Sequence, residues 1–282
     1  MSFKPDPDQL IWFITETSPG FTYELVRILL ERGDYVIATS LHSDQILEDF
    51  PNAGEQLYAI TLDLTDSMHI NQVVSEVLYR FRRIDILVNN AGYELIGAVE
   101  EASDEEIEAI FEANVLGTLR MIRTILPCFR AQLSGHIINM SSIGGLVGLP
   151  GWGIYNSTQF AIEGFSEALA QEVDPLGIHV TLVEPAPSRA NFSSDSLVHC
   201  TKKIVDYEAS GGYVHKPLLE RQSIDPVQLA EAILNVVLSD KPPLHLLLGT
   251  TAYELASAKL YELRNEFNTW RDVTLSSDFK SN

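Results

Sequence analysis

The alternation of short apolar runs with amphipathic stretches limits the fold of this chain more than any other feature. A continuous apolar run such as Leu10–Ile14 is typical of a strand buried on both faces. The next stretch, 23–32, repeats its apolar positions at helical spacing and ends at Gly33. Further strands are predicted at 35–39, 57–62, 84–88, 136–140, 178–183 and 244–248. Strands that alternate with helices in this way predict an α/β fold, a doubly wound, Rossmann-type parallel sheet of seven strands with helices on both faces.

The domain organisation follows from the continuity of this pattern. The 282 residues contain no internal repeat and no linker, so we expect a single domain over 1–282. The pattern loosens over about 185–224, which is rich in Ser, Gly and Pro, and an irregular stretch of this length predicts a lid or binding loop. An amphipathic helix is predicted over about 250–270, before a polar tail.

Charge and composition exclude several classes of partner. The chain has 19 Lys and Arg against 39 Asp and Glu, a formal charge of −20, which argues against nucleic acid and against an anionic membrane surface. No apolar run approaches the roughly 18 residues of a membrane span, and the first residues lack the pattern of a signal peptide. Cys128 and Cys200 are far apart, and the seven histidines show no metal-ligand spacing. We therefore expect a cytoplasmic protein without a metal.

Two hydroxyl side chains mark the candidate site. Ser142 follows the strand predicted at 136–140, and Tyr155 opens the helix predicted over 155–173. In a strand–loop–helix unit both side chains lie at the carboxyl edge of a parallel sheet, where open α/β folds bind their ligands. The sequence therefore predicts a small-molecule site that contains a serine and a tyrosine.

Several short motifs accompany this pair in a fixed order along the chain. They are Asp63-Leu64, Asn89-Asn90-Ala91-Gly92, Asn114, and Ser142 with Tyr155. At this order and spacing the chain resembles the short-chain dehydrogenases/reductases over nearly its whole length. The resemblance implies catalytic roles for Ser142, Tyr155 and Asn114, and it places Gln159 where the family has its active-site lysine. The counterparts of the family's cofactor contacts are Thr15, Gly20, Asp63, Asn90 and Ala91.

The cofactor positions are also where the chain departs from the family pattern. The family's nucleotide turn reads Thr-Gly-x-x-x-Gly-x-Gly, and here Glu16 and Thr22 replace two of the glycines. A carboxylate roughly 5 Å from a phosphate charge is repelled by about 3 kcal/mol at an effective dielectric constant of ~20. Further departures, each at a position that the resemblance implies for cofactor contact, are Leu41, Gln159, Ala186 and Ala190.

These departures lead us to expect a site without a nicotinamide cofactor. Without a lysine, Tyr155 is expected to titrate near its free value of ~10 and to act, with Ser142, as an acid or hydrogen-bond donor to a carbonyl. The expected reaction is redox-neutral: isomerisation, dehydration or cyclisation of a hydrophobic carbonyl compound. Several side chains remain open as a general base, namely Glu16, Glu94, Glu184, His199 and His215.

Two other interpretations stay open. The first is an NADP(H)-dependent ketone/alcohol oxidoreductase with an atypical site, and the second is a non-catalytic binding relative. The resemblance also implies a homo-oligomer that pairs through the helices at about 115–132 and 155–173.

Overall fold

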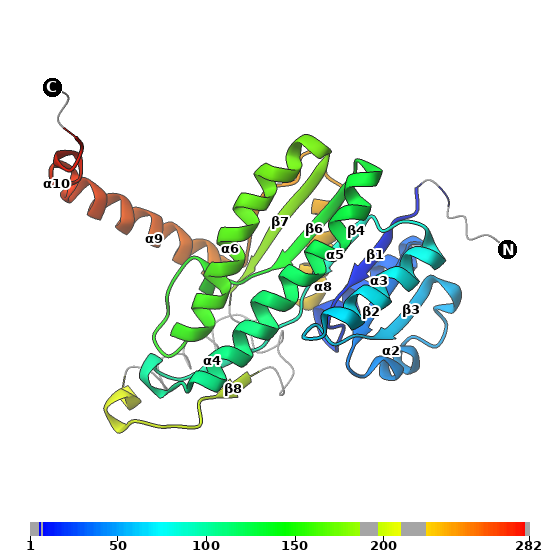
Figure 1. The fold of residues 1–282 in the computed structure, drawn as a ribbon, viewed down its shortest axis with the longest axis horizontal. Helices are drawn as coiled ribbons and strands as arrows, with labels where there is room; N and C mark the ends of the chain where they lie inside the picture. Colours follow the sequence, from blue (N-terminus) through cyan, green and yellow to red (C-terminus); the bar gives the residue numbers. More distant parts are fainter. Residues whose placement is uncertain (1–5, 7, 187–196, 210–223, 280–282) are drawn as a thin grey trace.

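A computed structural model describes residue 6 and residues 8–186, 197–209 and 224–279. In this part of the chain seven strands form one parallel sheet in the order β3-β2-β1-β4-β6-β7-β9 (Figure 1). The predicted fold class is therefore confirmed. The strands are β1 (Ile11–Ile14), β2 (Tyr35–Ser40), β3 (Leu57–Thr61), β4 (Ile86–Asn89), β6 (Gly135–Met140), β7 (Ile178–Pro185) and β9 (His245–Leu248).

Helices cover both faces of the sheet because successive residues of a buried strand point to opposite sides. Ile11 and Phe13 of β1 pack into the core beneath the helices α3 (Ser67–Phe81), α5 (Gly117–Gln132) and α6 (Gly153–Val173). Trp12 and Ile14 pack into the opposite core, beneath α1 (Phe21–Arg32) and α8 (Pro226–Val237). The continuous apolar run of this strand is thus the consequence of burial on both faces.

The remaining helices lie outside these two layers or at their edges. They are α2 (Ser43–Asp49), α4 (Asp104–Phe111), α9 (Thr250–Thr269) and α10 (Arg271–Ser276). The helix α9 runs away from the body of the sheet toward the carboxyl terminus (Figure 1). No helix in the described part of the chain combines the length and the apolar character that a membrane span needs.

Local capping signals in the sequence set several helix ends. Gly33 ends α1 in the left-handed conformation, with φ of 94°. Ser103 and Glu106 form a capping box at the start of α4. The side chain of Asp225 accepts a hydrogen bond from the backbone of Val227 at the start of α8.

Two features near the candidate site differ from the sequence prediction. The first is a π-helical turn, Glu112–Leu116, that joins α4 to α5. Asn114 lies in this turn, and its carbonyl oxygen accepts a hydrogen bond from Thr118 Oγ1 at 2.8 Å. Turns of this kind occur mostly as single bulges inside α-helices, often near functional sites. Apolar periodicity does not reveal them because they change the helical phase over one turn only.

The second feature is a separate parallel pair, β5 (Glu94–Ile96) with β8 (Leu197–His199). Each strand has three residues, which is too short for an alternating pattern to be recognised. Gly97 follows β5 and allows a close contact, because a Cβ atom there would lie 2.4 Å from Cys200 Sγ. β8 begins the stretch 197–209, which is the described interior of the predicted lid, since 187–196 and 210–223 lie outside the described residues.

Candidate active site

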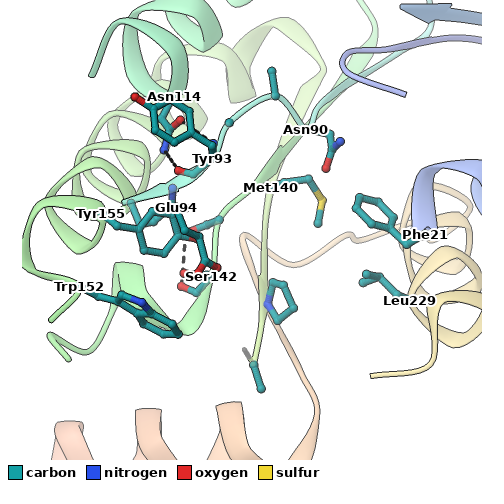
Figure 2. Close-up of a pocket in the computed structure, with 16 residues that line it drawn as sticks. Phe21, Asn90, Tyr93, Glu94, Asn114, Met140, Ser142, Trp152, Tyr155 and Leu229 are labelled. Atoms are coloured by element: carbon teal, nitrogen blue, oxygen red, sulfur yellow. Dashed lines mark hydrogen bonds between the residues drawn. The ribbon is translucent and has the colours of Figure 1, made fainter. Parts of the chain in front are cut away.

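The candidate site is a cleft at the carboxyl edge of the sheet, between the start of α1 and the ends of β4, β6 and β7 (Figure 2). This edge is where parallel sheets bind ligands, because the strand order reverses there and the loops diverge. The side chains that line the cleft include Phe21, Asn90, Glu94, Asn114, Met140, Ser142, Trp152, Tyr155, Gln159 and Leu229.

Ser142 and Tyr155 lie together in this cleft, as the sequence predicts. Ser142 follows β6 and begins a short 3-10 turn, where its Oγ accepts a hydrogen bond from Gly144 N at 2.9 Å. Tyr155 lies in the first turn of α6, and its hydroxyl is hydrogen-bonded to Ser142 (Figure 2). The two hydroxyls therefore form one polar group in a cleft whose wall contains both polar and apolar side chains.

The surroundings of Tyr155 keep it protonated. Burial raises the pKa of the phenol far above its ordinary value, the nearby Glu94 carboxyl raises it further, and the hydrogen bond from Ser142 opposes this rise. Among the described residues that line the cleft, none is lysine, arginine or histidine. Without a cation to stabilise a phenolate, Tyr155 is a hydrogen-bond and proton donor at neutral pH.

Asn114 and Gln159 also line the cleft, but their amides are engaged within the protein. Asn114 Oδ1 accepts from Tyr93 N at 3.0 Å, while its Nδ2 donates to Tyr93 O at 2.9 Å and to Thr158 Oγ1 at 3.2 Å. Asn114 thus holds the backbone that leads into Glu94. Gln159 is buried, and its Nε2 donates to Thr158 Oγ1 at 3.4 Å. It adds an amide where the family has a charge.

Glu94 is the carboxyl that the structure brings into the cleft. It is the first residue of β5, it is 2% exposed, and its Oε2 has no hydrogen-bond partner among the described residues. Burial raises the pKa of Glu94 to about 8. The sequence left five candidates for a general base open, and of the four that the structure describes only Glu94 lines this cleft.

The other candidates lie elsewhere or are not described. Glu16 is half-buried in the nucleotide turn, Glu184 is buried against His245 at the end of β7, and His199 is exposed on β8. His215 lies outside the described residues. Glu94 is part of β5, which pairs with β8, and no local pattern in the sequence indicates that pairing. The sequence alone therefore could not single out Glu94.

The predicted cofactor positions fall into two groups. Thr15, Gly20, Asn90 and Ala91 meet at the nucleotide turn, where Thr15 Oγ1 accepts hydrogen bonds from Asn90 N at 2.9 Å and Ala91 N at 3.3 Å. Asp63 lies apart, at the end of β3, and its carboxylate accepts two hydrogen bonds from Thr65, which hold its pKa below the usual range.

The backbone of the nucleotide turn has a conformation that favours glycine, although the residue there is Glu16. Glu16 adopts a left-handed backbone with φ of 51°, a conformation that glycine adopts with little strain and that is unfavourable for glutamate. Burial raises the pKa of the Glu16 carboxyl, and the charge of His42 partly offsets this. Gly20 precedes α1 without a side-chain cap, so the first N–H groups of the helix point to an anion site.

The raised pKa of Glu94 predicts how the free energy of unfolding changes with pH. Between its ordinary value of 4.5 and about 8, the folded protein holds a proton that the unfolded chain has released, so stability falls as pH rises through this window. We expect Glu94→Gln to match the wild type at about pH 4 and to exceed its free energy of unfolding by about 3 kcal/mol at pH 7. Urea unfolding at the two pH values measures this.

The exposed carboxyl of Glu105 on α4 provides the control for that measurement. Glu105→Gln is expected to change the free energy of unfolding by less than about 0.5 kcal/mol at either pH. A Glu94→Gln effect of equal size at both pH values would show that Glu94 is ionised normally in the fold.

Comparisons with known proteins agree with this geometry. The family model described as short chain dehydrogenase matches residues 11–199. The chain is 35% identical to "Oxidoreductase BOA17" of Botryotinia fuckeliana, over 95% of this chain and 98% of that protein. It is also 35% identical to a 3-ketodihydrosphingosine reductase of Bacteroides thetaiotaomicron, over 85% and 87%. The crystal structure of a short-chain dehydrogenase from Streptomyces avermitilis matches with a TM-score of 0.90 at 34% identity, over 97% of this chain and 100% of that one.

These findings correct two of the expectations above. The relatives are named as oxidoreductases and a reductase, and a serine dehydrogenase structure that matches at 26% identity and a TM-score of 0.72, over 85% of this chain and 94% of that one, holds NADP⁺. The expectation of a cofactor-free site and the expectation of a redox-neutral isomerisation, dehydration or cyclisation are therefore wrong. The physical reason is that helix starts bind phosphate groups through backbone N–H groups, and the side-chain departures leave the uncapped start of α1 in place. The chain belongs to the short-chain dehydrogenase family.

Proposed function

We propose that this protein is an NADP(H)-dependent oxidoreductase that interconverts a ketone and a secondary alcohol on a hydrophobic small molecule. The observation that carries the proposal is the hydrogen-bonded pair of Ser142 and Tyr155 in a cleft that opens toward the start of α1. Two hydroxyl donors on one wall suit a carbonyl oxygen, which accepts two hydrogen bonds and gains negative charge as it is reduced.

The residues of the cleft are compatible with a nicotinamide dinucleotide. The uncapped start of α1 after Gly20 offers N–H groups to the diphosphate, and Asn90 and Ala91 line the path from there to Tyr155. Gln159, Pro185 and Ala186 line the same cleft and would surround the nicotinamide end. Among the departures from the family pattern Glu16 fits a dinucleotide least well, because its half-buried carboxyl lies in the turn itself.

The chemistry of the chain's own residues follows from their protonation. When bound, the cofactor supplies or accepts the hydride. Ser142 donates a hydrogen bond to the substrate oxygen and orients it, and Tyr155 passes its proton to that oxygen during reduction. Glu94, which shares the cleft, carries a proton below about pH 8, so its charge opposes loss of the Tyr155 proton only above that pH.

Apolar side chains favour a hydrophobic substrate. Phe21, Met140, Trp152 and Leu229 form much of the wall of the cleft, and burial of apolar substrate area against them contributes about 25 cal/mol per Å². The relatives named as a 3-ketodihydrosphingosine reductase and a 17-beta-hydroxysteroid dehydrogenase act, by their names, on long or polycyclic molecules.

A cytoplasmic location stays a prediction, which fractionation of the native host cell would test.

The proposal is tested by titrating the protein with NADPH and with NADH and then by assaying reduction of a panel of hydrophobic ketones. We expect saturable NADPH binding and NADPH-dependent reduction, and we expect Tyr155→Phe to lower kcat/KM by at least about 100-fold because the proton donor is lost. Tyr79→Phe, an exposed tyrosine on α3, is the matched control and should leave kcat/KM unchanged. If neither NADPH nor NADH bound to the protein, the proposal would be refuted.

Glu16 provides a second prediction. We expect Glu16→Gly to tighten NADPH binding by about 100-fold, because it removes a carboxylate roughly 5 Å from a phosphate and relieves a left-handed backbone. Glu31→Gln, at the far end of α1, changes the net charge equally and is expected to alter the dissociation constant by less than about twofold. If both variants changed the dissociation constant of NADPH equally, the cause would be the net charge of the protein and not the position of Glu16.

We also expect the protein to form a homo-oligomer through α5 and α6. Phe160 is an aromatic side chain exposed on α6, which supports an association surface on that helix. Light scattering coupled to size exclusion should give a mass above 31.4 kDa, and Phe160→Asp should lower it to that of one chain. The control Tyr79→Asp, at an exposed position on α3, should leave the mass in solution unchanged. A wild-type mass of one chain would contradict this expectation.

A further inference from the structure

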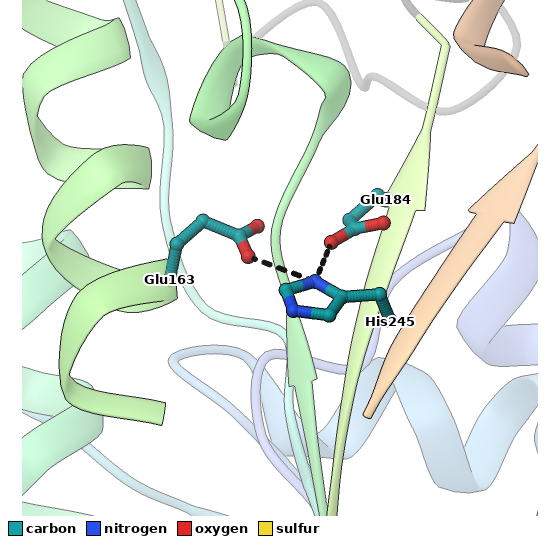
Figure 3. A group of neighbouring side chains, drawn as sticks. All are labelled: Glu163, Glu184 and His245. Atoms are coloured by element: carbon teal, nitrogen blue, oxygen red, sulfur yellow. Dashed lines mark hydrogen bonds and ion pairs between the residues drawn. The ribbon is translucent and has the colours of Figure 1, made fainter. Parts of the chain in front are cut away.

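Three ligand-type side chains converge outside the cleft, on its far side from the nucleotide turn. Glu163 comes from α6, Glu184 from the end of β7 and His245 from the start of β9 (Figure 3). His245 Nδ1 lies 2.7 Å from Glu184 Oε1 and 3.6 Å from Glu163 Oε2. One potential ligand atom of each residue lies within 4.8 Å of those of the other two.

The group contains more acceptors than donors. Glu163 is 4% exposed and Glu184 is fully buried. Among the described residues, Glu163 Oε2 and Glu184 Oε2 have no hydrogen-bond partner, although Glu163 Oε1 accepts from Ser141 Oγ at 2.5 Å. A single imidazole faces both carboxyl groups, and a third acidic group, Glu167, lies 3.8 Å from its Nε2. Buried carboxylates require a proton or a cation to offset their desolvation.

We propose that Glu163, Glu184 and His245 bind a divalent transition-metal ion, with Zn²⁺ as the best match. Two carboxylates and one imidazole form a mixed oxygen and nitrogen set, and Zn²⁺ bound by three such ligands completes its shell with water. The oxygen Glu163 Oε2 points into the group toward Nδ1, the atom that faces both carboxyl groups (Figure 3). His245 is 40% exposed on its side chain, which leaves a path for the ion and for a water ligand.

The ion would have a structural role that does not depend on the proposed activity. It joins the last strand of the sheet to β7 and α6, two successive elements that lie about 60 residues or more before it in the sequence. Through Ser141, which precedes Ser142, it also fixes the loop that carries one of the two site hydroxyls. Glu184 precedes Pro185 of the cleft wall, so the metal group and the cleft share the end of β7.

The test is calorimetric titration of the chelator-treated full chain with Zn²⁺, together with thermal unfolding. We expect saturable binding at this site and a rise in Tm of roughly 5 °C at a free Zn²⁺ concentration a hundredfold above Kd. Glu163→Gln and His245→Gln should each weaken that binding at least tenfold and remove most of the Tm rise. Mg²⁺, which prefers oxygen ligands only, should produce no comparable rise.

His179→Gln is the matched control, because His179 is an exposed histidine on the neighbouring strand β7. This variant should bind Zn²⁺ like the wild type. Unfolding of each variant without metal verifies that it folds, and Glu163→Gln keeps the shape of the side chain beside Ser141. No saturable binding, or binding that survives both Glu163→Gln and His245→Gln, would overturn the proposal and leave a carboxyl pair that shares a proton.

Discussion

Parallel pairing of the strands is the constraint on which the rest of the structure depends. Because the strands run in one direction, their carboxyl ends share one edge, and the residues that follow them meet there whatever their separation in sequence. Ser142 follows β6, Asn90 follows β4 and Glu184 ends β7. The cleft results from this convergence, and in the proposed metal group Glu184 is placed by it, while Glu163 comes from α6 and His245 from the start of β9.

Among the described residues that line the cleft none is a cation, and this affects the protonation of Tyr155. Where the family has a lysine, Gln159 supplies an amide that is engaged with Thr158, and Glu94 adds a carboxyl close to Tyr155. The missing lysine removes a positive charge that would stabilise a phenolate, and burial raises the pKa of Tyr155 further, so its phenol is protonated at neutral pH. The charge of Glu94 adds to this effect only above about pH 8.

Much of the fold was accessible from the sequence because it depends on local patterns. Buried runs gave the strands, and Gly33, Ser103 and Asp225 marked helix ends. The Ser142 and Tyr155 pair was predictable from its place after a strand. The β5–β8 pair was not, because three-residue strands carry no periodicity, and its absence from the prediction left Glu94 as one candidate base among five. The group of Glu163, Glu184 and His245 was equally hidden, since the three residues belong to separate elements.

The expectation of a cofactor-free site failed for a physical reason. It counted side chains at presumed contacts, whereas the diphosphate site of this fold is made largely by backbone N–H groups at the start of α1. Glu16 weakens such a site by about 3 kcal/mol but does not remove its donors. When backbone groups bind the cofactor, the loss of side-chain motifs therefore overstates the loss of cofactor binding.

The central claim is that the cleft transfers a hydride between a nicotinamide dinucleotide and a hydrophobic carbonyl compound. The most direct measurement is to incubate the protein with NADPH that carries deuterium at both hydrogen positions of the reactive carbon and a ketone that it reduces, and to locate the label in the product by mass spectrometry. Our account predicts one deuterium on the new carbinol carbon, and no labelled product with Tyr155→Phe on the same timescale. Failure to transfer the label to any member of a broad panel of hydrophobic ketones would contradict it.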